Sequence, residues 1–287
     1  MILTFESCPK NVEHSEDGSF HHGPFFGVFD SFSPPYCQEH PQEMSDGLTA
    51  GQIVRHAVME AIYGLGSETK ILDALEIIND TVYRAQETRG LIGSADNLAG
   101  ASFVLCKKEK RFIKILQGGD CLTVGIYKNG SIRFTDNPFK KYESRLRERI
   151  AELRGKTSDK KEMWNAFYST LCNSRKTHSN EGYPILNGQK NLLHLVEKIC
   201  MPCKELSMMV SLTDGLTPWS EVEGLGDKQV AETVGRFFFS ERPSPETVAT
   251  SFQNMLAWAR KAEDDKDREK TSHASHAEAT CQVFLPD

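Results

Sequence analysis

The strand-like segments of this chain come in runs, and its helical segments come in pairs. Apolar residues spaced three and four apart predict two pairs of helices, at residues 48–65 and 70–88 and at residues 227–239 and 245–262. Between the pairs, short β-prone stretches predict strands at residues 101–106, 111–117, 121–127 and 131–134. Successive strands can pair directly only when they are antiparallel, because parallel neighbours need a long crossover. The pattern therefore favours antiparallel sheets flanked by helix pairs, which is an α+β fold class.

Turn signals and further apolar runs support this prediction. The turn Lys128-Asn129-Gly130 indicates a tight hairpin, because Asn-Gly readily supplies the positive φ angles that such a turn needs. Additional strands are expected at residues 2–5, 25–29, 206–213 and 280–285. A helix is expected at residues 160–172, and an exposed, charge-rich one at residues 139–154. We expect the charged segment 263–279 to be a mobile loop.

Size, charge and cysteine usage narrow the class of protein. The 287 residues fit one large domain or two small ones, and the net charge of −6 gives no nucleic-acid footprint. The eight cysteines are scattered along the chain, which favours reduced thiols in a cytosolic or nuclear protein, and we expect a cytoplasmic location. No stretch approaches the roughly 20 apolar residues of a membrane span. We therefore expect neither nucleic acid nor membrane among its partners.

Four segments carry short motifs in a fixed order. They are Phe25 to Asp30, Ala99 to Leu105, Gln117 to Cys121, and Ser211 to Leu216 with Trp219 nearby. They resemble four motifs of the metal-dependent type 2C (PPM) protein phosphatases. These are the strand ending in Asp-Gly-His-Gly-Gly, the small-residue strand Ser-Gly-Ser-Thr-Ala, the Gly-Asp-Ser-Arg turn, and Ser-Asp-Gly-Leu-Trp-Asp. The last expected strand is similar to the one that closes the family's fold.

The resemblance implies a fold and a chemistry. The fold would be a sandwich of two antiparallel sheets with helix pairs on both faces (α-β-β-α). It would form a single domain, residues 1–287, with a flap-like insertion at about 139–200. Active members of the family hydrolyse phosphoserine and phosphothreonine with two Mg²⁺ or Mn²⁺ ions. Such ions prefer oxygen ligands, and they activate a bridging water for attack on phosphorus.

The resemblance assigns four candidate metal ligands. Asp30 matches the aspartate that bridges both metals, and Asp214 matches a ligand of the first metal. Glu13, followed by His14, matches the second-metal glutamate of the family's Met-Glu-Asp. Asp120 matches the Gly-Asp turn, which some members use for a third metal. Each has an alternative role, because aspartates after strands also begin ordinary turns and Glu13 can belong to a solvated loop.

Other catalytic positions are changed. Phe32 replaces the histidine proposed as general acid, and phenylalanine has no proton to give. Ala277 stands where a first-metal aspartate is expected, and Glu278 could take over only if the strand slipped by one residue. The family's phosphate-binding arginine would fall at or near Pro9 and Lys10, and lysine lacks the bidentate fork of arginine.

These losses predict a pseudophosphatase. We expect a catalytically degenerate PPM-type protein that acts in signalling as a binding or regulatory module. Its partner would be a protein or phosphoprotein. The chain itself would have no catalytic residues and no cofactor. The alternative is an active, atypical Ser/Thr phosphatase that binds two Mg²⁺ or Mn²⁺ ions weakly. A third possibility is an unrelated α/β scaffold without this ancestry.

Histidines and a cysteine pair leave two smaller questions open. A rewired metal site could join Asp30 and Asp214 to His14, His273 or His276, because imidazole suits Zn²⁺ better than Mg²⁺. The favoured alternative is that these histidines belong to surface loops. The Cys-x-x-Cys at 200–203 is best explained as two ordinary thiols in a turn, since a zinc site needs two further ligands.

Overall fold

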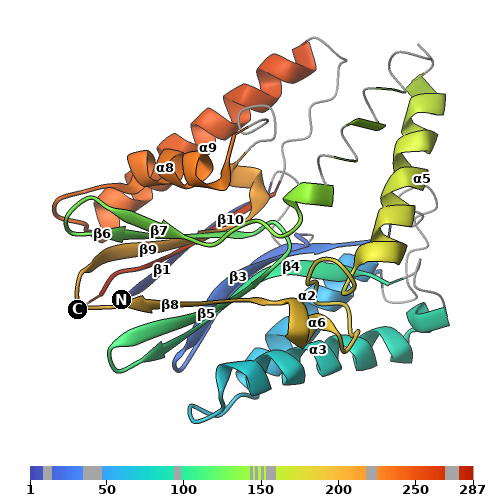
Figure 1. Ribbon diagram of the computed structural model, residues 1–287, viewed down its shortest axis with the longest axis horizontal. Helices are drawn as coiled ribbons and strands as arrows, with labels where there is room; N and C mark the ends of the chain where they lie inside the picture. Colours follow the sequence, from blue (N-terminus) through green and yellow to red (C-terminus); the bar gives the residue numbers. More distant parts are fainter. Residues whose placement is uncertain are drawn as a thin grey trace.

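Two five-stranded antiparallel sheets lie face to face in the computed structural model (Figure 1). The structure describes residues 1–8, 15–34, 47–93, 98–142, 145, 148–149, 152, 160–217, 225–268 and 278–286. One sheet has the order β2 (Asp17–His22), β3 (Phe25–Phe32), β4 (Gly100–Glu109), β5 (Phe112–Gly118), β8 (Glu197–Pro202). The other has the order β1 (Ile2–Ser7), β10 (Ala279–Phe284), β9 (Leu206–Leu212), β6 (Leu122–Tyr127), β7 (Ile132–Phe134).

Helix pairs cover the outer faces of both sheets. Helices α2 (Ala50–Tyr63) and α3 (Ile71–Thr88) pack on the β2–β3–β4 side, and α8 (Asp227–Phe238) and α9 (Pro245–Arg268) pack on the other sheet (Figure 1). The predicted α-β-β-α sandwich is therefore confirmed. Shorter helices are α6 (Leu192–Leu195) and two single turns, η2 (Leu91–Gly93) and η4 (Asp214–Leu216). The long helix α5 (Lys160–His178) stands at one end of the sandwich (Figure 1).

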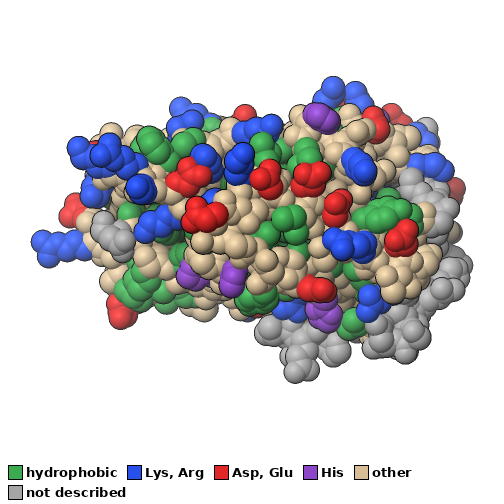
Figure 2. Space-filling view, turned by 90° about the horizontal axis from the view of Figure 1, so that it is seen from below, with side chains coloured by type: hydrophobic (Ala, Val, Ile, Leu, Met, Phe, Trp, Pro, Cys, Tyr) green, Lys and Arg blue, Asp and Glu red, His purple; other side chains and the backbone are tan. Residues whose placement is uncertain are grey.

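Three apolar layers hold the sandwich together. One lies under each helix pair, and the third lies between the sheets, where Phe26 stacks on Phe284 with ring centroids 5.5 Å apart. Each sheet alternates its side chains between two faces, so burying both faces needs helices outside and the partner sheet inside. Figure 2 shows the face on the α2–α3 side, where acidic and basic side chains are interspersed over the described residues.

The two chain termini lie side by side at one end of the sandwich, on the edge strand β1 and its neighbour β10. Strands β1 and β10 pair antiparallel, and the N-terminal amine of Met1 donates to the carbonyl of Leu285 at 2.7 Å. Strand β10 also pairs with β9. This pairing brings together the segment after β1, the segment before β10 and the end of β9, which lie far apart in the sequence. The candidate site is built there, at the end of the strands opposite the two termini.

Some sequence predictions were incomplete or wrong. Strands β2 and β8 were not predicted, and α5 runs to His178, six residues past the predicted end at 172. Residues 263–268, which we expected in a mobile loop, belong to α9 and continue the helix that begins at Pro245. Cys200 lies in strand β8 rather than in a turn, and Cys203 follows that strand. Half of the residues of the helix expected at 139–154 lie outside the described residues, as does Trp219.

Within the described residues, the search for membrane-spanning helices finds none with the necessary length and apolar character.

Candidate functional site: an acidic centre at the edge of the sandwich

Two aspartates face each other where the β2–β3 hairpin opens. Asp17 is the first residue of β2, and the antiparallel register pairs it with Asp30 of β3. Burial raises the pKa of Asp17 from 3.8 to about 7. Burial also raises the pKa of Asp30 well above its ordinary value, and the negative charge of Asp17 adds to that effect. Their carboxyl groups share a hydrogen bond, so one of them carries the proton.

Two further aspartates approach the same point from other strands. Asp214 begins η4 directly after β9, and Asp120 lies in the turn between β5 and β6. The negative charges of both raise the pKa of Asp30 further. One carboxylate oxygen of Asp120, Oδ1, is buried and has no hydrogen-bond partner among the described residues. Three of the four predicted ligands, Asp30, Asp120 and Asp214, therefore come together, while Glu13 lies outside the described residues.

Thr213 ties the acidic centre to the second sheet. Its hydroxyl donates to Oδ2 of Asp17 at 2.7 Å and accepts from the backbone amide of Thr280 at 2.9 Å. The side chain is completely buried. One threonine thus satisfies a carboxylate of the first sheet and a backbone amide of the second, which fixes the two sheets relative to each other at this edge.

Glu278 holds the chain that enters β2. Its Oε2 accepts hydrogen bonds from the Ser15 hydroxyl at 2.7 Å, the Glu16 amide at 2.7 Å and the Asp17 amide at 3.1 Å. The other oxygen, Oε1, lies 3.5 Å from the Cys8 thiol, which donates to it. Glu278 is the expected substitute ligand for Ala277 only if the strand slips by one residue. Its carboxylate instead serves as the acceptor for a short backbone segment, and Ala277 lies outside the described residues.

The side chain of Glu16 accepts hydrogen bonds from residues next to the N-terminus of helix α2. Its Oε1 accepts from the Ser33 hydroxyl at 2.8 Å and from the Thr49 hydroxyl at 2.5 Å. Thr49 is the N-cap of α2, so the negative charge of Glu16 lies near the positive end of the helix dipole. Both glutamates beside the acidic centre thus have structural hydrogen-bond partners.

The described part of the chain contains only some of the expected metal-ligand positions, because Glu13 and Ala277 lie outside it. No group of three His, Cys, Asp or Glu side chains there is placed to hold a metal ion. The unpartnered oxygen of Asp120 and the raised pKa of Asp30 mark a concentration of negative charge at this edge of the sandwich. His14, His273 and His276, proposed for a rewired site, lie outside the described residues.

A cation from α5 covers the residue that replaces the expected general acid. The guanidinium carbon of Arg175 lies 4.0 Å from the ring centroid of Phe32. Its Nη1 donates to the carbonyl of Ser33 at 3.1 Å. Planar stacking of arginine on an aromatic ring is favourable, and it fixes the C-terminal part of α5 against the end of β3.

Sequence reasoning missed Asp17 and Arg175. A signal for Asp17 was present, because Gly23-Pro24 is a turn dipeptide directly before a predicted strand. Gly23 adopts a φ of 55° in that turn, and counting outward from it pairs residue 17 with residue 30. Arg175 carried no local signal, because its contact with Phe32 joins segments 143 positions apart in the sequence.

Comparison with known proteins shows a fold shared with bacterial phosphatases. No protein-family profile matches the sequence, and no curated protein matches it. Serine/threonine phosphatase Stp1 of Staphylococcus aureus is 12% identical, with a TM-score of 0.56, over 100% of this chain and 94% of that one. PppA, described as a regulatory component of the type VI secretion system in Pseudomonas aeruginosa, is 13% identical, with a TM-score of 0.57, over 100% and 97%.

A third structure carries metal. The catalytic domain of the phosphatase PstP, solved in complex with two manganese ions, is 12% identical, with a TM-score of 0.53, over 100% of this chain and 98% of that one. At such low identity these likenesses show the fold alone. This chain has the PPM-type phosphatase fold over its whole length, and its chemistry must be argued from its own residues.

Proposed function

We propose that this chain is a PPM-type phosphatase-like protein without metal-dependent phosphatase activity, which acts as a binding or regulatory module for a protein or phosphoprotein partner. The observation that carries the proposal is the hydrogen bonding of Glu278. It is the residue nearest in sequence that could replace the missing aspartate at Ala277, and three donors from residues 15–17 occupy its Oε2. This engagement of Glu278 supports a first-metal ligand set that is one carboxylate short.

The residues around Asp30 support the same conclusion. We take Glu16-Asp17, in place of Glu13-His14, as the counterpart of the family's Met-Glu-Asp, because Asp17 pairs with Asp30. The carboxylate of Glu16 then accepts from Ser33 and Thr49. Phe32, at the expected general-acid position, cannot protonate a leaving alkoxide. A ligand and a proton donor are thus lost together, while the strands that would present them are intact.

A phosphatase assay tests the proposal. The purified full-length chain is incubated with a phosphothreonine peptide or an aryl phosphate, with millimolar Mn²⁺ or Mg²⁺. We expect no phosphate release above that of an Asp30→Ala control. Metal-dependent release by the wild type that is absent from the Asp30→Ala protein would overturn the proposal.

An active, atypical phosphatase is the second candidate, and the charge of the site favours it. Asp17, Asp30, Asp120 and Asp214 influence one another electrostatically. A divalent cation is the largest local charge in such a site and would relieve their repulsion. Two weakly bound Mg²⁺ or Mn²⁺ ions would satisfy the unpartnered oxygen of Asp120. The assay above separates the two candidates directly.

The rewired site needs its own measurement. Calorimetric titration of Zn²⁺, Mn²⁺ and Mg²⁺ into the wild type and a His14→Ala/His276→Ala double variant compares the two proteins. Weaker Zn²⁺ binding by the double variant would support ligation by these histidines. Equal or absent binding in both would end that hypothesis and leave the proposal of an inactive phosphatase fold untouched.

Free thiols support the cellular location that we propose, and the order of the elements supports the domain organisation that we propose. The six cysteines among the described residues are all free thiols, which suits the reducing cytoplasm that we propose as its location. We propose one domain over residues 1–287, in which residues from about 139 to 200 form a flap-like insertion that includes α5 and ends within β8. Partner binding would use this end of the sandwich, where Arg175 joins the insertion to Phe32.

A further inference from the structure

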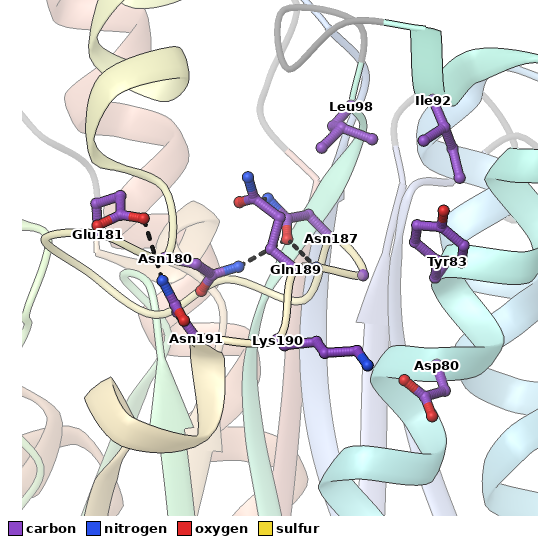
Figure 3. Close-up of a pocket in the computed structure, with 11 residues that line it drawn as sticks. Asp80, Tyr83, Ile92, Leu98, Asn180, Glu181, Asn187, Gln189, Lys190 and Asn191 are labelled. Carbon is purple, nitrogen blue, oxygen red and sulfur yellow. Dashed lines mark hydrogen bonds between the residues drawn. The ribbon is translucent and has the colours of Figure 1, made fainter.

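A separate cavity of about 430 Å³ lies between α3 and the segment 180–191 (Figure 3). It shares no lining residue with the acidic centre. Its volume lies in the range of small-molecule sites, about 300–1,000 Å³. Three groups of residues form it: an apolar wall, a floor of amide side chains, and charged side chains at the rim.

The floor of the cavity is rigid. Asn180 and Asn187 are 1% and 4% exposed, and the Asn180 amide donates to Oδ1 of Asn187 at 2.6 Å. Asn187 in turn donates to Oε1 of Gln189 at 2.8 Å. Asn180 also exchanges two hydrogen bonds with the backbone of Ile185, at 2.8 and 2.9 Å, which stabilise its positive φ of 54°.

Helix α3 anchors the same floor from below. The Asn79 amide donates to the carbonyl of Gln189 at 3.0 Å and accepts from the Gly188 amide at 2.9 Å. Gln86 donates to the carbonyl of Asn187 at 3.1 Å. These buried amides have their partners before any ligand arrives, so the cavity is preformed and binding would not have to order the loop.

The rim and wall offer groups that the protein itself leaves unused. Ile92, Leu98 and the ring of Tyr83 form the apolar wall, as Figure 3 shows. Within the described part of the chain, the Asp80 carboxylate, the Tyr83 hydroxyl and the Lys190 ammonium make no hydrogen bond. In Figure 3 the side chain of Lys190 extends toward Asp80, so opposite charges lie on one side of the cavity.

The charges select the class of ligand. A simple anion would meet the carboxylates of Asp80 and Glu181, and a simple cation would meet the ammonium of Lys190. A molecule with both charges is attracted at both ends. The apolar wall adds a requirement for a hydrophobic group, since desolvating Ile92 and Leu98 favours an aliphatic or aromatic substituent.

We propose that this cavity binds a zwitterionic small molecule of the α-amino acid type with an apolar side chain, either the free amino acid or a short peptide. Its ammonium pairs with Asp80, its carboxylate pairs with Lys190, and its side chain packs against Tyr83, Ile92 and Leu98. This inference is independent of the proposed function, because none of these residues belongs to the acidic centre.

Ligand-observed NMR and calorimetry on the full-length protein test the ligand chemistry. The probes are L-leucine, L-phenylalanine and the dipeptide leucylglycine, each compared with leucinamide and N-acetylleucine. Leucinamide lacks the carboxylate, and N-acetylleucine lacks the ammonium. We expect binding of the zwitterions, with affinity at least tenfold lower for both blocked compounds. Tighter binding of leucine than of leucylglycine would assign the site to free amino acids, and the reverse order to peptides.

Variants of two exposed residues locate the site. Asp80→Asn and Lys190→Gln should each weaken zwitterion binding at least tenfold. Asp73→Asn, on the same helix, and Lys204→Gln, on another loop, lie outside the cavity lining and should leave binding unchanged. The proposal is overturned if none of the zwitterions binds at up to about 10 mM, a concentration that would detect even the millimolar range of weak ligands, or if both cavity variants bind like their controls.

Discussion

Asp17 and Asp30 face each other at the open end of the β2–β3 hairpin, and their carboxyl groups share a hydrogen bond. Two buried carboxyl groups in such contact cannot both be charged without a large repulsion, so the pair retains a proton near neutral pH. The pair lies where the two sheets meet, because the hydroxyl of Thr213 from the second sheet donates to Asp17. Deprotonating both carboxyl groups at this edge of the sandwich would therefore destabilise the folded state.

This proton makes stability depend on pH. In the unfolded chain Asp17 loses its proton near its ordinary pKa of 3.8, whereas in the folded protein it holds the proton up to about pH 7. Between these values the folded state binds more protons, so the contribution of Asp17 to the free energy of unfolding falls as the pH rises. Above about pH 7 Asp17 is deprotonated in both the folded and the unfolded state, so the free energy of unfolding no longer changes with pH through this residue.

Asp17→Asn isolates the effect. Asparagine keeps an oxygen that can accept from Thr213 and has no charge to desolvate. We expect the variant to gain stability relative to the wild type progressively from pH 4 to pH 7, reaching about 1–3 kcal/mol at pH 8. Urea unfolding across this range measures the difference. Asp73→Asn, an exposed carboxylate on α3, is the control and should give a flat difference. An equally flat profile for Asp17→Asn would contradict the raised pKa.

A sequence predicts those elements whose pattern is local, and it fails where distant segments decide the structure. The helix pairs and most strands were predictable, because apolar periodicity is local. Strand β2 was not, because its residues DGSFHH include only one large apolar side chain, Phe20. Strand β8 was missed for a similar reason, since Glu197 and Lys198 open it and Pro202 ends it. Tertiary pairing with strong neighbours decides such segments.

The residues of the candidate site likewise divide into those that local motifs identify and those whose roles depend on long-range contacts. Asp30 directly follows the apolar run 25–29, and Asp120 and Asp214 each follow a strand with a clear apolar pattern, so motif resemblance could identify all three. The roles of Glu278 and Arg175 depend on contacts across 261 or more positions and across 143 positions, respectively. Side-chain hydrogen bonds of that sequence range leave no periodic trace. Resemblance could say which residue type was missing, but not that Glu278 was already engaged elsewhere.

The three hydrogen bonds to Glu278 predict a cost for removing its charge. In Glu278→Gln, the amide oxygen can take the position of Oε2 but carries no negative charge, so its hydrogen bonds from Ser15, Glu16 and Asp17 become weaker. The new amide group then faces the Cys8 thiol, which loses its acceptor. We expect a loss of about 1–3 kcal/mol in the free energy of unfolding. Chemical denaturation measures it. Glu205→Gln is the matched control at an exposed position and should change stability by less than about 0.5 kcal/mol.

The stack of Arg175 on Phe32 predicts a measurable coupling between α5 and β3. A double-mutant cycle with Arg175→Ala and Phe32→Leu removes each partner separately and together. We expect a coupling free energy of about 0.5–2 kcal/mol, since the stack is partly desolvated. A parallel cycle of Arg84→Ala with Phe32→Leu should show none, because Arg84 is exposed on α3. Additive effects in the first cycle would show that the contact contributes nothing to stability.

The turn that presents Asp120 predicts the largest local effect of a small substitution. Gly119 has a φ of +74°, and an added Cβ would lie 2.1 Å from Oγ of Ser102 and 2.8 Å from its Cα. Gly90 has nearly the same φ, +71°, but has open space around it. Both Gly→Ala variants carry the strain of a left-handed alanine, about 1 kcal/mol, and only Gly119→Ala adds a clash with the backbone of β4.

Comparing the two variants therefore separates strain from packing. We expect Gly90→Ala to lose about 1 kcal/mol and Gly119→Ala to lose at least about 2 kcal/mol more, because β4 must shift to admit the methyl group. A shift of β4 would also move Ser102, which pairs with Asp30, so the pH dependence attributed to Asp17 and Asp30 should weaken in Gly119→Ala and persist in Gly90→Ala. Urea unfolding at pH 5 and pH 8 measures both quantities. Equal losses in the two variants would mean that the turn is free to relax, and that the position of Asp120 is not fixed by its contact with Ser102.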